Sequence, residues 1–358
     1  MLFKTKSRES HIPTFIIESN HYLYRKALKR EIGIWRNSNS NQNFLEEEFD
    51  NIRFSYLNNN YIFKCNNDWI KFLTLFGPFK KALVLGGNKT GLEEYLLKNK
   101  IVENIENLDI IHKGSNSIIQ FADLNFAELK KDTYDLVIAK SILHHIINLE
   151  HLLLEVNHSL KPNGKLVAFE YIGENKQQWT QYKIDLINKN FQCNDIIPKY
   201  FFNKLKHNLY NEWPFESIRS QDVPEVIEDI FPETKIIEIR WGKLNWAIKY
   251  HLSQYCFEKR IKLERGDEKI LADRAEELDK LFFKDKQLLP CYLFGIYSKS
   301  TKGRMDIHVE KWDNKKINNE LAIHGPIMRR IKSFISSNQH TIYIQFLLKI
   351  KSALKKFI

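Results

Sequence analysis

The sequence has few cysteines and no long apolar run. No segment reaches the roughly 18 consecutive apolar residues of a membrane-spanning helix, and the first ten residues, MLFKTKSRES, contain no apolar stretch typical of a signal peptide. The cysteines are scattered and form no Cys-x-x-Cys pair, which argues against a disulfide framework or a zinc knuckle. We therefore expect a cytoplasmic protein and predict no metal site. The four cysteines are Cys65, Cys193, Cys256 and Cys291.

Acidic residues are scarce in the last part of the chain. Residues 301–358 contain 12 Lys and Arg against 4 Asp and Glu, so they hold most of the net charge of +11. The body before them is nearly balanced, and we predict no nucleic-acid binding. Apolar residues at helical spacing from Tyr343 to Phe357 predict a basic amphipathic helix. Such a helix binds a membrane surface or a partner, or it packs on its own body or on a second subunit.

The most regular pattern of the sequence runs from Tyr134 to Gly173. Apolar runs at 136–139 and 166–169 predict two buried strands of a parallel sheet. Between them, apolar residues from Leu149 to Leu160 recur at helical spacing, and Pro162-Asn163-Gly164 predicts a turn. This is a βαβ unit, whose ligands lie at the carboxyl ends of its strands. The polar residues at those ends are Lys140, Ser141, His144, His145, Glu170 and Tyr171.

A second βαβ half precedes it. An apolar strand at 82–85 leads into the loop Gly86–Gly91, and the following strand ends at Asp109. Glycines allow a ligand to approach the backbone, and an acid at this position can accept hydrogen bonds from ribose hydroxyls. The loop lacks the middle glycine of the dinucleotide fingerprint. After a short strand at 118–121, Asp123 could accept a hydrogen bond from an adenine amino group, or it could form a turn or helix cap.

In this order, the motifs resemble those of class I S-adenosylmethionine-dependent methyltransferases of the small-molecule and glycan type. The resemblance covers about residues 80–173, and a later Glu-Tyr-x-Gly and Gln-Trp pattern is similar to a bacterial subgroup that serves cell-surface polysaccharide synthesis. It implies an α/β fold, with a Rossmann-like seven-stranded sheet and helices on both faces. The motifs are Val84-Leu85-Gly86-Gly87, Leu108-Asp109, Ala122-Asp123-Leu124, Tyr134-Asp135-Leu136-Val137, Leu143-His144-His145 and Leu160-Lys161-Pro162-Asn163-Gly164.

The resemblance also implies roles for individual residues. S-adenosylmethionine is the expected cofactor, and O-methylation of a small-molecule or glycan acceptor is the expected reaction. The candidate bases that take a proton from the acceptor hydroxyl are His145 and His144, followed by Glu170. At least one of the two histidines could instead pack structurally and bond the backbone. The expected cofactor contacts come from Gly86, Gly87, Asn88, Asp109, Asp123, Leu124 and Lys140.

The glycine loop leaves two alternatives open. Asn88 and Thr90 stand where the family usually has glycine, and Lys89 stands where an acid is common. These differences favour a methyltransferase-like binding module without catalysis. A nicotinamide-dependent oxidoreductase is a second alternative, because Asp109 after a glycine loop also suits that cofactor.

The remaining segments predict a domain order. Residues 1–75 are expected to form a helical cap, 76–300 the methyltransferase domain, and 301–358 a basic helical tail. Within the domain, the aromatic-rich insertion 174–234 is expected to form a lid or acceptor pocket. The expected acceptor contacts are Tyr171, Trp179 and Arg219. Arg219 could instead pair with Glu170 or form another structural ion pair. Further along, we predict helices at 223–231 and 267–283 and strands at 235–240 and 291–297.

Overall fold

The fold described below is that of a computed structural model of the 358-residue chain. The structure describes twelve continuous stretches of the chain. It also describes some helical positions between 266 and 281. The stretches are 14–16, 19, 21–37, 54–55, 62–63, 68–86, 91–111, 118–175, 181–190, 214–241, 290–301 and 309–311.

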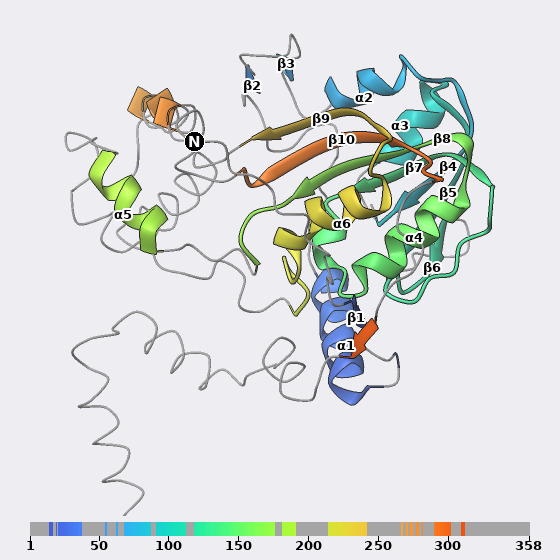
Figure 1. The fold of residues 1–358 in the computed structure, drawn as a ribbon, viewed down its shortest axis with the longest axis horizontal. Helices are drawn as coiled ribbons and strands as arrows, with labels where there is room; N and C mark the ends of the chain where they lie inside the picture. The colour runs from blue at the N-terminus through green and yellow to red at the C-terminus, as the bar shows by residue number, and fades with distance from the viewer. Residues whose placement is uncertain are drawn as a thin grey trace, which may run out of the picture.

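A seven-stranded sheet forms the centre of the molecule (Figure 1). Within this sheet, the five strands from β4 to β8 pair in parallel. Strand β10 is antiparallel to both β8 and β9. This arrangement confirms the predicted α/β fold with its seven-stranded sheet, and the two late strands that were expected at 235–240 and 291–297 pair antiparallel. Across the sheet, the order is β6 (Ile119–Phe121), β5 (Val102–Asp109), β4 (Phe79–Leu85), β7 (Tyr134–Lys140), β8 (Leu160–Tyr171), β10 (Tyr292–Ser298) and β9 (Lys235–Trp241).

Helices cover both faces of this sheet, because its central strands are apolar on both sides. On β7, Val137 and Ala139 belong to one core cluster, whereas Leu136 and Ile138 belong to the other. The first cluster is completed by α4 (Leu149–Ser159) and α6 (Val223–Ile230). The second is completed by α2 (Asp68–Leu73) and α3 (Leu92–Lys98). Figure 1 shows α4 and α6 together on one side of the strands.

The segment Pro162-Asn163-Gly164 differs from its prediction as a separate turn. The helix ends at Ser159, and β8 begins at Leu160, opposite Tyr134. The register then shifts, so that Lys165 faces Leu136. The strands approach closely here: a Cβ on Gly164 would lie 2.9 Å from the carbonyl oxygen of Tyr134. The Pro-Asn-Gly sequence thus forms an irregularity within the strand.

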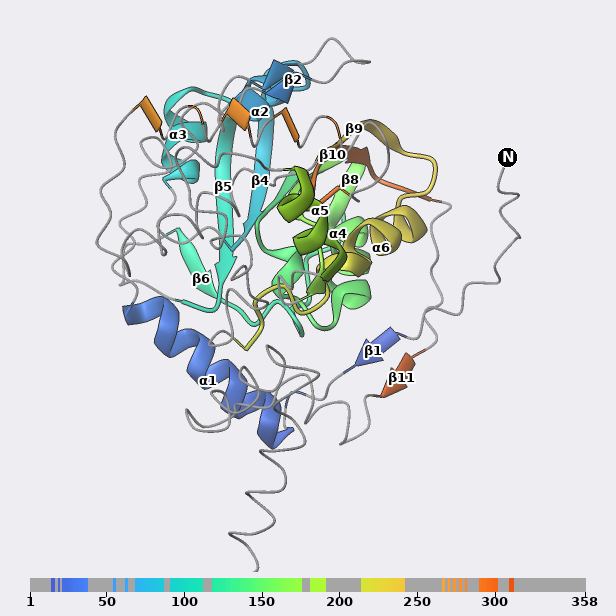
Figure 2. The same ribbon diagram turned by 90° about the vertical axis from the view of Figure 1, so that its left-hand side faces the viewer.

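Helix α1 (Tyr22–Asn37) lies across the carboxyl ends of the parallel strands (Figure 2). Its Tyr24 is buried and donates a hydrogen bond of 2.7 Å to Oδ2 of Asp123, just beyond β6. The Tyr24 ring also stacks on Phe215, with ring centroids 5.6 Å apart. The predicted N-terminal helical cap thus includes a helix that borders the ligand edge of the sheet.

The remaining described elements are short. The α5 helix (Gln181–Asn190) and the 3-10 turn η4 (Ser220–Asp222) lie in the predicted insertion. Two small sheets pair β1 (Thr14–Ile16) with β11 (Val309–Lys311), and β2 (Phe54–Ser55) with β3 (Ile62–Phe63). The predicted amphipathic helix near the C-terminus lies outside the described residues.

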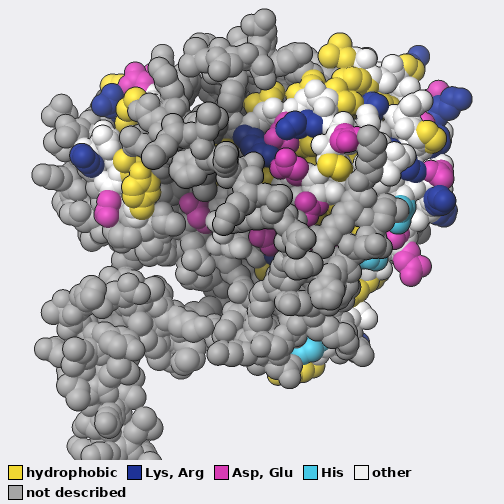
Figure 3. Space-filling model, viewed as in Figure 1, with side chains coloured by type: hydrophobic (Ala, Val, Ile, Leu, Met, Phe, Trp, Pro, Cys, Tyr) yellow, Lys and Arg dark blue, Asp and Glu magenta, His cyan; other side chains and the backbone are white. Residues whose placement is uncertain are grey.

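Charges of both signs are mixed over the described surface on the right-hand side of Figure 3. Over the part of the chain that the structure describes, no helix has both the length and the hydropathy that crossing a bilayer requires.

Candidate active site

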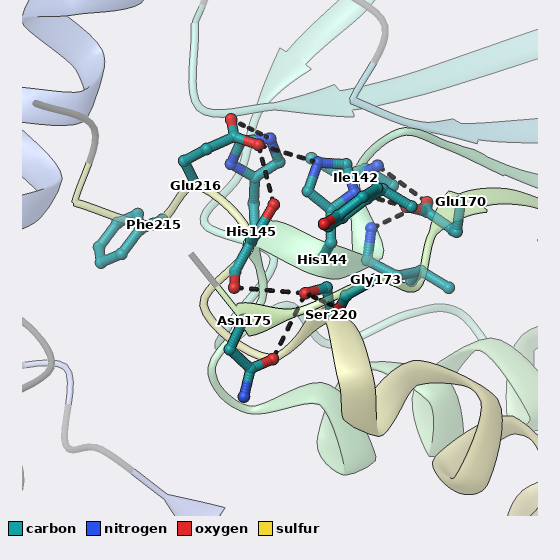
Figure 4. A network of polar contacts seen from close by, with 12 residues as sticks. Ile142, His144, His145, Glu170, Gly173, Asn175, Phe215, Glu216 and Ser220 are labelled. Atoms are coloured by element: carbon teal, nitrogen blue, oxygen red, sulfur yellow. Dashed lines mark hydrogen bonds and ion pairs between the residues drawn. The ribbon is translucent and has the colours of Figure 1, made fainter. Parts of the chain in front are cut away.

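The turn after β7 is anchored by a buried carboxylate on the neighbouring strand. Glu170 near the end of β8 accepts N–H groups from Ile142 at 2.8 Å and Leu143 at 2.9 Å through Oε1. Its other oxygen lies 2.8 Å from Nδ1 of His144. His144 and His145 belong to the short 3-10 turn η1 (Leu143–His145). Glu170 therefore fixes both the backbone of this turn and one of its imidazoles (Figure 4).

This contact determines the charge of His144. Burial alone would lower the pKa of its imidazole, but the hydrogen bond to Glu170 and the charges of Glu170 and Glu216 outweigh burial. The pKa of His144 is consequently raised, which favours the imidazolium. The Nδ1 proton is therefore assigned to the side facing Glu170, so Nε2 points toward the second carboxylate of the site.

That second carboxylate is Glu216. Its Oε1 lies 3.7 Å from Nε2 of His144, and its Oε2 lies 3.6 Å from Nε2 of His145. Ser217 donates a hydrogen bond of 3.0 Å to the Glu216 carboxylate and has a positive φ of 50°. The segment is held by a 2.9 Å bond from the N–H of Ile218 to the carbonyl of His144. A positive φ costs free energy in a residue other than glycine, so the surroundings of Ser217 must impose this backbone conformation.

Glu31 of α1 is the third carboxylate beside the two histidines, after Glu170 and Glu216. Its Oε1 lies 3.7 Å from Nδ1 of His145 and accepts a bond of 2.9 Å from the indole of Trp35. Burial raises the pKa of Glu31 to about 7. Burial also lowers the pKa of His145 to about 4, despite the nearby charge of Glu216. At neutral pH, His145 is therefore a neutral imidazole that can accept a proton.

The predicted cofactor side begins at Gly86, at the end of β4. Its φ is +70°, and an added Cβ would lie 3.0 Å from Cδ1 of Ile142. Its N–H bonds to the carbonyl of Leu108, which brings it level with the end of β5. There the buried Asp109 accepts the N–H of Ile111 at 2.9 Å. A turn with a positive φ and little room for a Cβ, next to a carboxylate at a strand end, fits a nucleoside-type cofactor. The predicted contacts Gly87 and Asn88 lie outside the described residues.

The other predicted cofactor residues have additional structural roles. Asp123 accepts the backbone N–H of Asn125 at 3.1 Å, which is the turn-forming alternative considered from the sequence, and also the Tyr24 hydroxyl. Leu124 is buried in the core cluster beneath the edge. Lys140 ends β7 with its ammonium 6.0 Å from the centroid of the Phe169 ring, and burial lowers the pKa of Lys140 to about 8.

Of the predicted acceptor residues, Tyr171 lies beside the histidines and Arg219 pairs with Glu150. Tyr171 is near the histidines: its ring centroid lies 6.1 Å from that of His144. Trp179 lies outside the described residues. Arg219 is buried and forms a structural ion pair, as one of the alternatives predicted, but its partner is Glu150 and not Glu170. Its guanidinium instead bonds both oxygens of Glu150 at 2.7 Å and also contacts Asp222. Glu150 lies in the first turn of α4 and is itself buried.

Sequence reasoning missed Glu31 and Glu216. Both come from segments outside the resemblance, and neither lies in a motif. Glu216 stands in Trp213-Pro214-Phe215-Glu216-Ser217, three residues before the predicted acceptor contact Arg219. A charged residue between aromatic residues is a weak sign of burial. Only the packing of α1 and of residues 214–219 on η1 brings the two acids to the histidines.

One protein family matches part of the chain. Residues 99–168 match the family described as a methyltransferase domain. This segment is about one fifth of the chain and runs from the end of α3 into β8, so it includes Asp109, Asp123 and both histidines. Together with the sheet, the match supports the predicted S-adenosylmethionine-dependent methyltransferase. No curated protein matches the sequence.

Several solved methyltransferase structures align with part of this chain. A phosphoethanolamine N-methyltransferase of Haemonchus contortus is 13% identical, with a TM-score of 0.37 over 66% of this chain and 54% of that one. An S-adenosylmethionine-dependent methyltransferase from Mesorhizobium loti is 15% identical, with a TM-score of 0.34 over 64% and 96% of the two chains. A geranyl diphosphate methyltransferase is 11% identical, with a TM-score of 0.36 over 66% and 86%. The chain spans about half the length of the Haemonchus enzyme.

Proposed function

We propose that this protein transfers the methyl group of S-adenosylmethionine to a hydroxyl of a small-molecule or glycan acceptor. The observation that carries the proposal is the arrangement of two polar groups of residues along one sheet edge. Gly86 and Asp109 stand at the ends of β4 and β5, and His144, His145 and Glu170 stand at the ends of β7 and β8. A cofactor and an acceptor can therefore lie side by side across the strand ends.

The protein's own part in this reaction is positioning and proton removal. S-adenosylmethionine supplies a methyl group already activated by a sulfonium, so the carbon–sulfur bond breaks as the carbon–oxygen bond forms, with the electron pair remaining on sulfur. Asp109 is expected to hold the ribose hydroxyls. His145, which is neutral at pH 7, is expected to accept the proton of the acceptor hydroxyl. His144, bonded to Glu170, is expected to orient the acceptor rather than to take its proton.

The Glu170-Tyr171-Ile172-Gly173 and Gln178-Trp179 pattern supports a role in cell-surface polysaccharide synthesis in bacteria. A cytoplasmic enzyme held at the inner membrane face by the basic segment 326–358 would suit that role. Deleting 326–358 should then abolish binding to anionic vesicles in a flotation assay. Unchanged flotation would remove the membrane part of the proposal.

A screen with labelled methyl donor tests the reaction. The full-length protein is incubated with methyl-labelled S-adenosylmethionine and a panel of sugars, nucleotide sugars and small hydroxylated compounds. Transfer of label to one class, and its loss in His145→Asn, is expected. Binding of the donor without transfer to any class would favour the non-catalytic module. Binding of a nicotinamide cofactor in place of the donor would favour the oxidoreductase.

A further inference from the structure

Two imidazoles and one carboxylate converge at the centre of the edge described above. His144, His145 and Glu216 each offer one ligand atom, and these atoms all lie within 4.8 Å of one another. The Glu216 oxygens lie 3.7 Å from Nε2 of His144 and 3.6 Å from Nε2 of His145. Both distances are too long for hydrogen bonds. They are close to the distance of about 3.4 Å between neighbouring ligands of a tetrahedral zinc ion with bonds near 2.1 Å.

We propose that His144, His145 and Glu216 form a binding site for one divalent transition metal of the zinc class. Two histidines and a glutamate are a ligand set that zinc accepts when a fourth position stays open for water or substrate. Imidazole nitrogen favours zinc and its neighbours over magnesium, which prefers oxygen ligands. The proposal goes beyond methyl transfer. With a metal bound, Nε2 of His145 would be a ligand, so the base proposed for methyl transfer would be available only in the metal-free protein.

The outer hydrogen bond of His144 supports this assignment, whereas Glu31 lies beyond hydrogen-bond distance of His145. A metal-binding imidazole usually donates its second N–H to a carboxylate or carbonyl, which fixes the ring and leaves the other nitrogen for the metal. His144 has this contact with Glu170 at 2.8 Å, and Glu170 is itself fixed by two backbone N–H groups. His145 has Glu31 on its Nδ1 side at 3.7 Å. Both Nε2 atoms therefore face the Glu216 carboxylate (Figure 4).

The backbone around Glu216 gives a second, independent indication. Ser217 has a positive φ of 50° and is fully buried, and Ile218 bonds to the carbonyl of His144. This strained conformation aims the Glu216 side chain at the two rings instead of at solvent. Strain of this kind collects where a side chain is held in one geometry for binding or catalysis.

The charges also favour a cation. Three carboxylates, Glu31, Glu170 and Glu216, surround the two imidazoles. A divalent ion would offset the negative charge of these carboxylates.

Metal binding by the full-length protein tests the proposal. After treatment with a chelator that is then removed, the protein is dialysed against Zn²⁺, Co²⁺ or Mg²⁺, and bound metal is measured by elemental analysis. One Zn²⁺ or Co²⁺ per chain is expected, with at least a tenfold preference over Mg²⁺. Glu216→Gln and His145→Asn should each weaken Zn²⁺ binding about 100-fold or more, and Glu170→Gln about 10- to 100-fold.

A matched control and a stability measurement keep the result interpretable. His158→Asn, at the opposite end of α4, removes a histidine outside the cluster and should bind Zn²⁺ as the parent does. Zn²⁺ should raise the melting temperature of the parent protein and of His158→Asn, and this increase should be lost in Glu216→Gln. Absence of stoichiometric binding, or equal binding by the parent and Glu216→Gln, would overturn the site.

Titration with S-adenosylhomocysteine in parallel separates the two proposals. Zn²⁺ binding without S-adenosylhomocysteine binding would uphold the metal site and contradict the methyl-transfer function. The reverse outcome would overturn the metal site alone.

Discussion

The Nδ1 atom of His144 and the Oε2 atom of Glu170 lie 2.8 Å apart between neighbouring strand ends, and Glu170 is completely buried. Glu170→Gln keeps the shape of the side chain but removes its charge. We expect the pKa of His144 to fall and the free energy of unfolding to decrease by roughly 2 kcal/mol, because a charge-assisted bond is lost. Urea unfolding and an NMR titration of the imidazole measure the two effects. Glu225→Gln on the exposed side of α6 should change neither.

The ion pair between Arg219 and Glu150 gives a prediction about stability. Arg219→Ala leaves the buried Glu150 without its partner, so unfolding should become easier by about 3–5 kcal/mol. The double variant Glu150→Ala/Arg219→Ala should lose less than the sum of the two single variants. Arg274→Ala breaks an exposed pair with Glu277 and should cost less than about 1 kcal/mol. Equal effects at Arg219 and Arg274 would contradict the structural role of Arg219.

Gly86 and Gly91 form a matched pair at the two ends of the predicted cofactor loop. Both have a positive φ, so alanine costs about 1–2 kcal/mol of backbone strain at either position. At Gly86 the new Cβ would also meet Ile142 at 3.0 Å, whereas at Gly91 nothing lies within 4 Å. We therefore expect Gly86→Ala to be the more destabilising substitution in thermal unfolding. Adding Ile142→Ala should relieve the excess at position 86 only, and no relief would contradict the steric explanation.

The raised pKa of Glu31 predicts a pH dependence of stability. Its pKa in the folded protein, about 7, lies above its ordinary value of 4.5, so the folded state binds the proton more tightly than the unfolded state. The contribution of the protonated form is complete below pH 4.5 and is lost as the pH rises through 7. Relative to Glu31→Gln, the parent should therefore lose roughly 3 kcal/mol between these values. Urea unfolding at several pH values measures the difference.

Glu103→Gln is the control for this titration, because Glu103 is exposed on β5. Its stability difference from the parent should stay constant with pH. A constant difference for Glu31→Gln as well would contradict the burial of an ionisable carboxyl at the histidine turn.

The sheet and its crossover helix could be predicted because their signals are local. The apolar runs at 136–139 and 166–169 are buried on both faces, and Leu149, Leu152, Leu153 and Val156 occupy one helical face. The position of Asp109 follows from the end of its strand. Such patterns are typical of strands and helices whatever the rest of the chain does.

The surroundings of the histidines could not be predicted, because they depend on distant segments. Glu31 reaches His145 only because α1 crosses the strand ends, held there by contacts such as Tyr24 with Asp123. The sequence allows Arg219 to pair with either Glu170 or Glu150. Its pairing with Glu150 depends on how residues 214–222 pack beside the start of α4. Neither arrangement leaves a periodic signal in the sequence.

Calorimetric titration with S-adenosylhomocysteine tests the central claim, that the edge formed by Gly86 and Asp109 holds the methyl donor. The parent protein should bind one equivalent. Asp109→Ala should bind at least about tenfold more weakly, because it removes the expected ribose contact. Asp132→Asn, an exposed residue on the loop before β7, should bind as the parent does. No binding by the parent at millimolar ligand, or equal binding by Asp109→Ala, would contradict the claim.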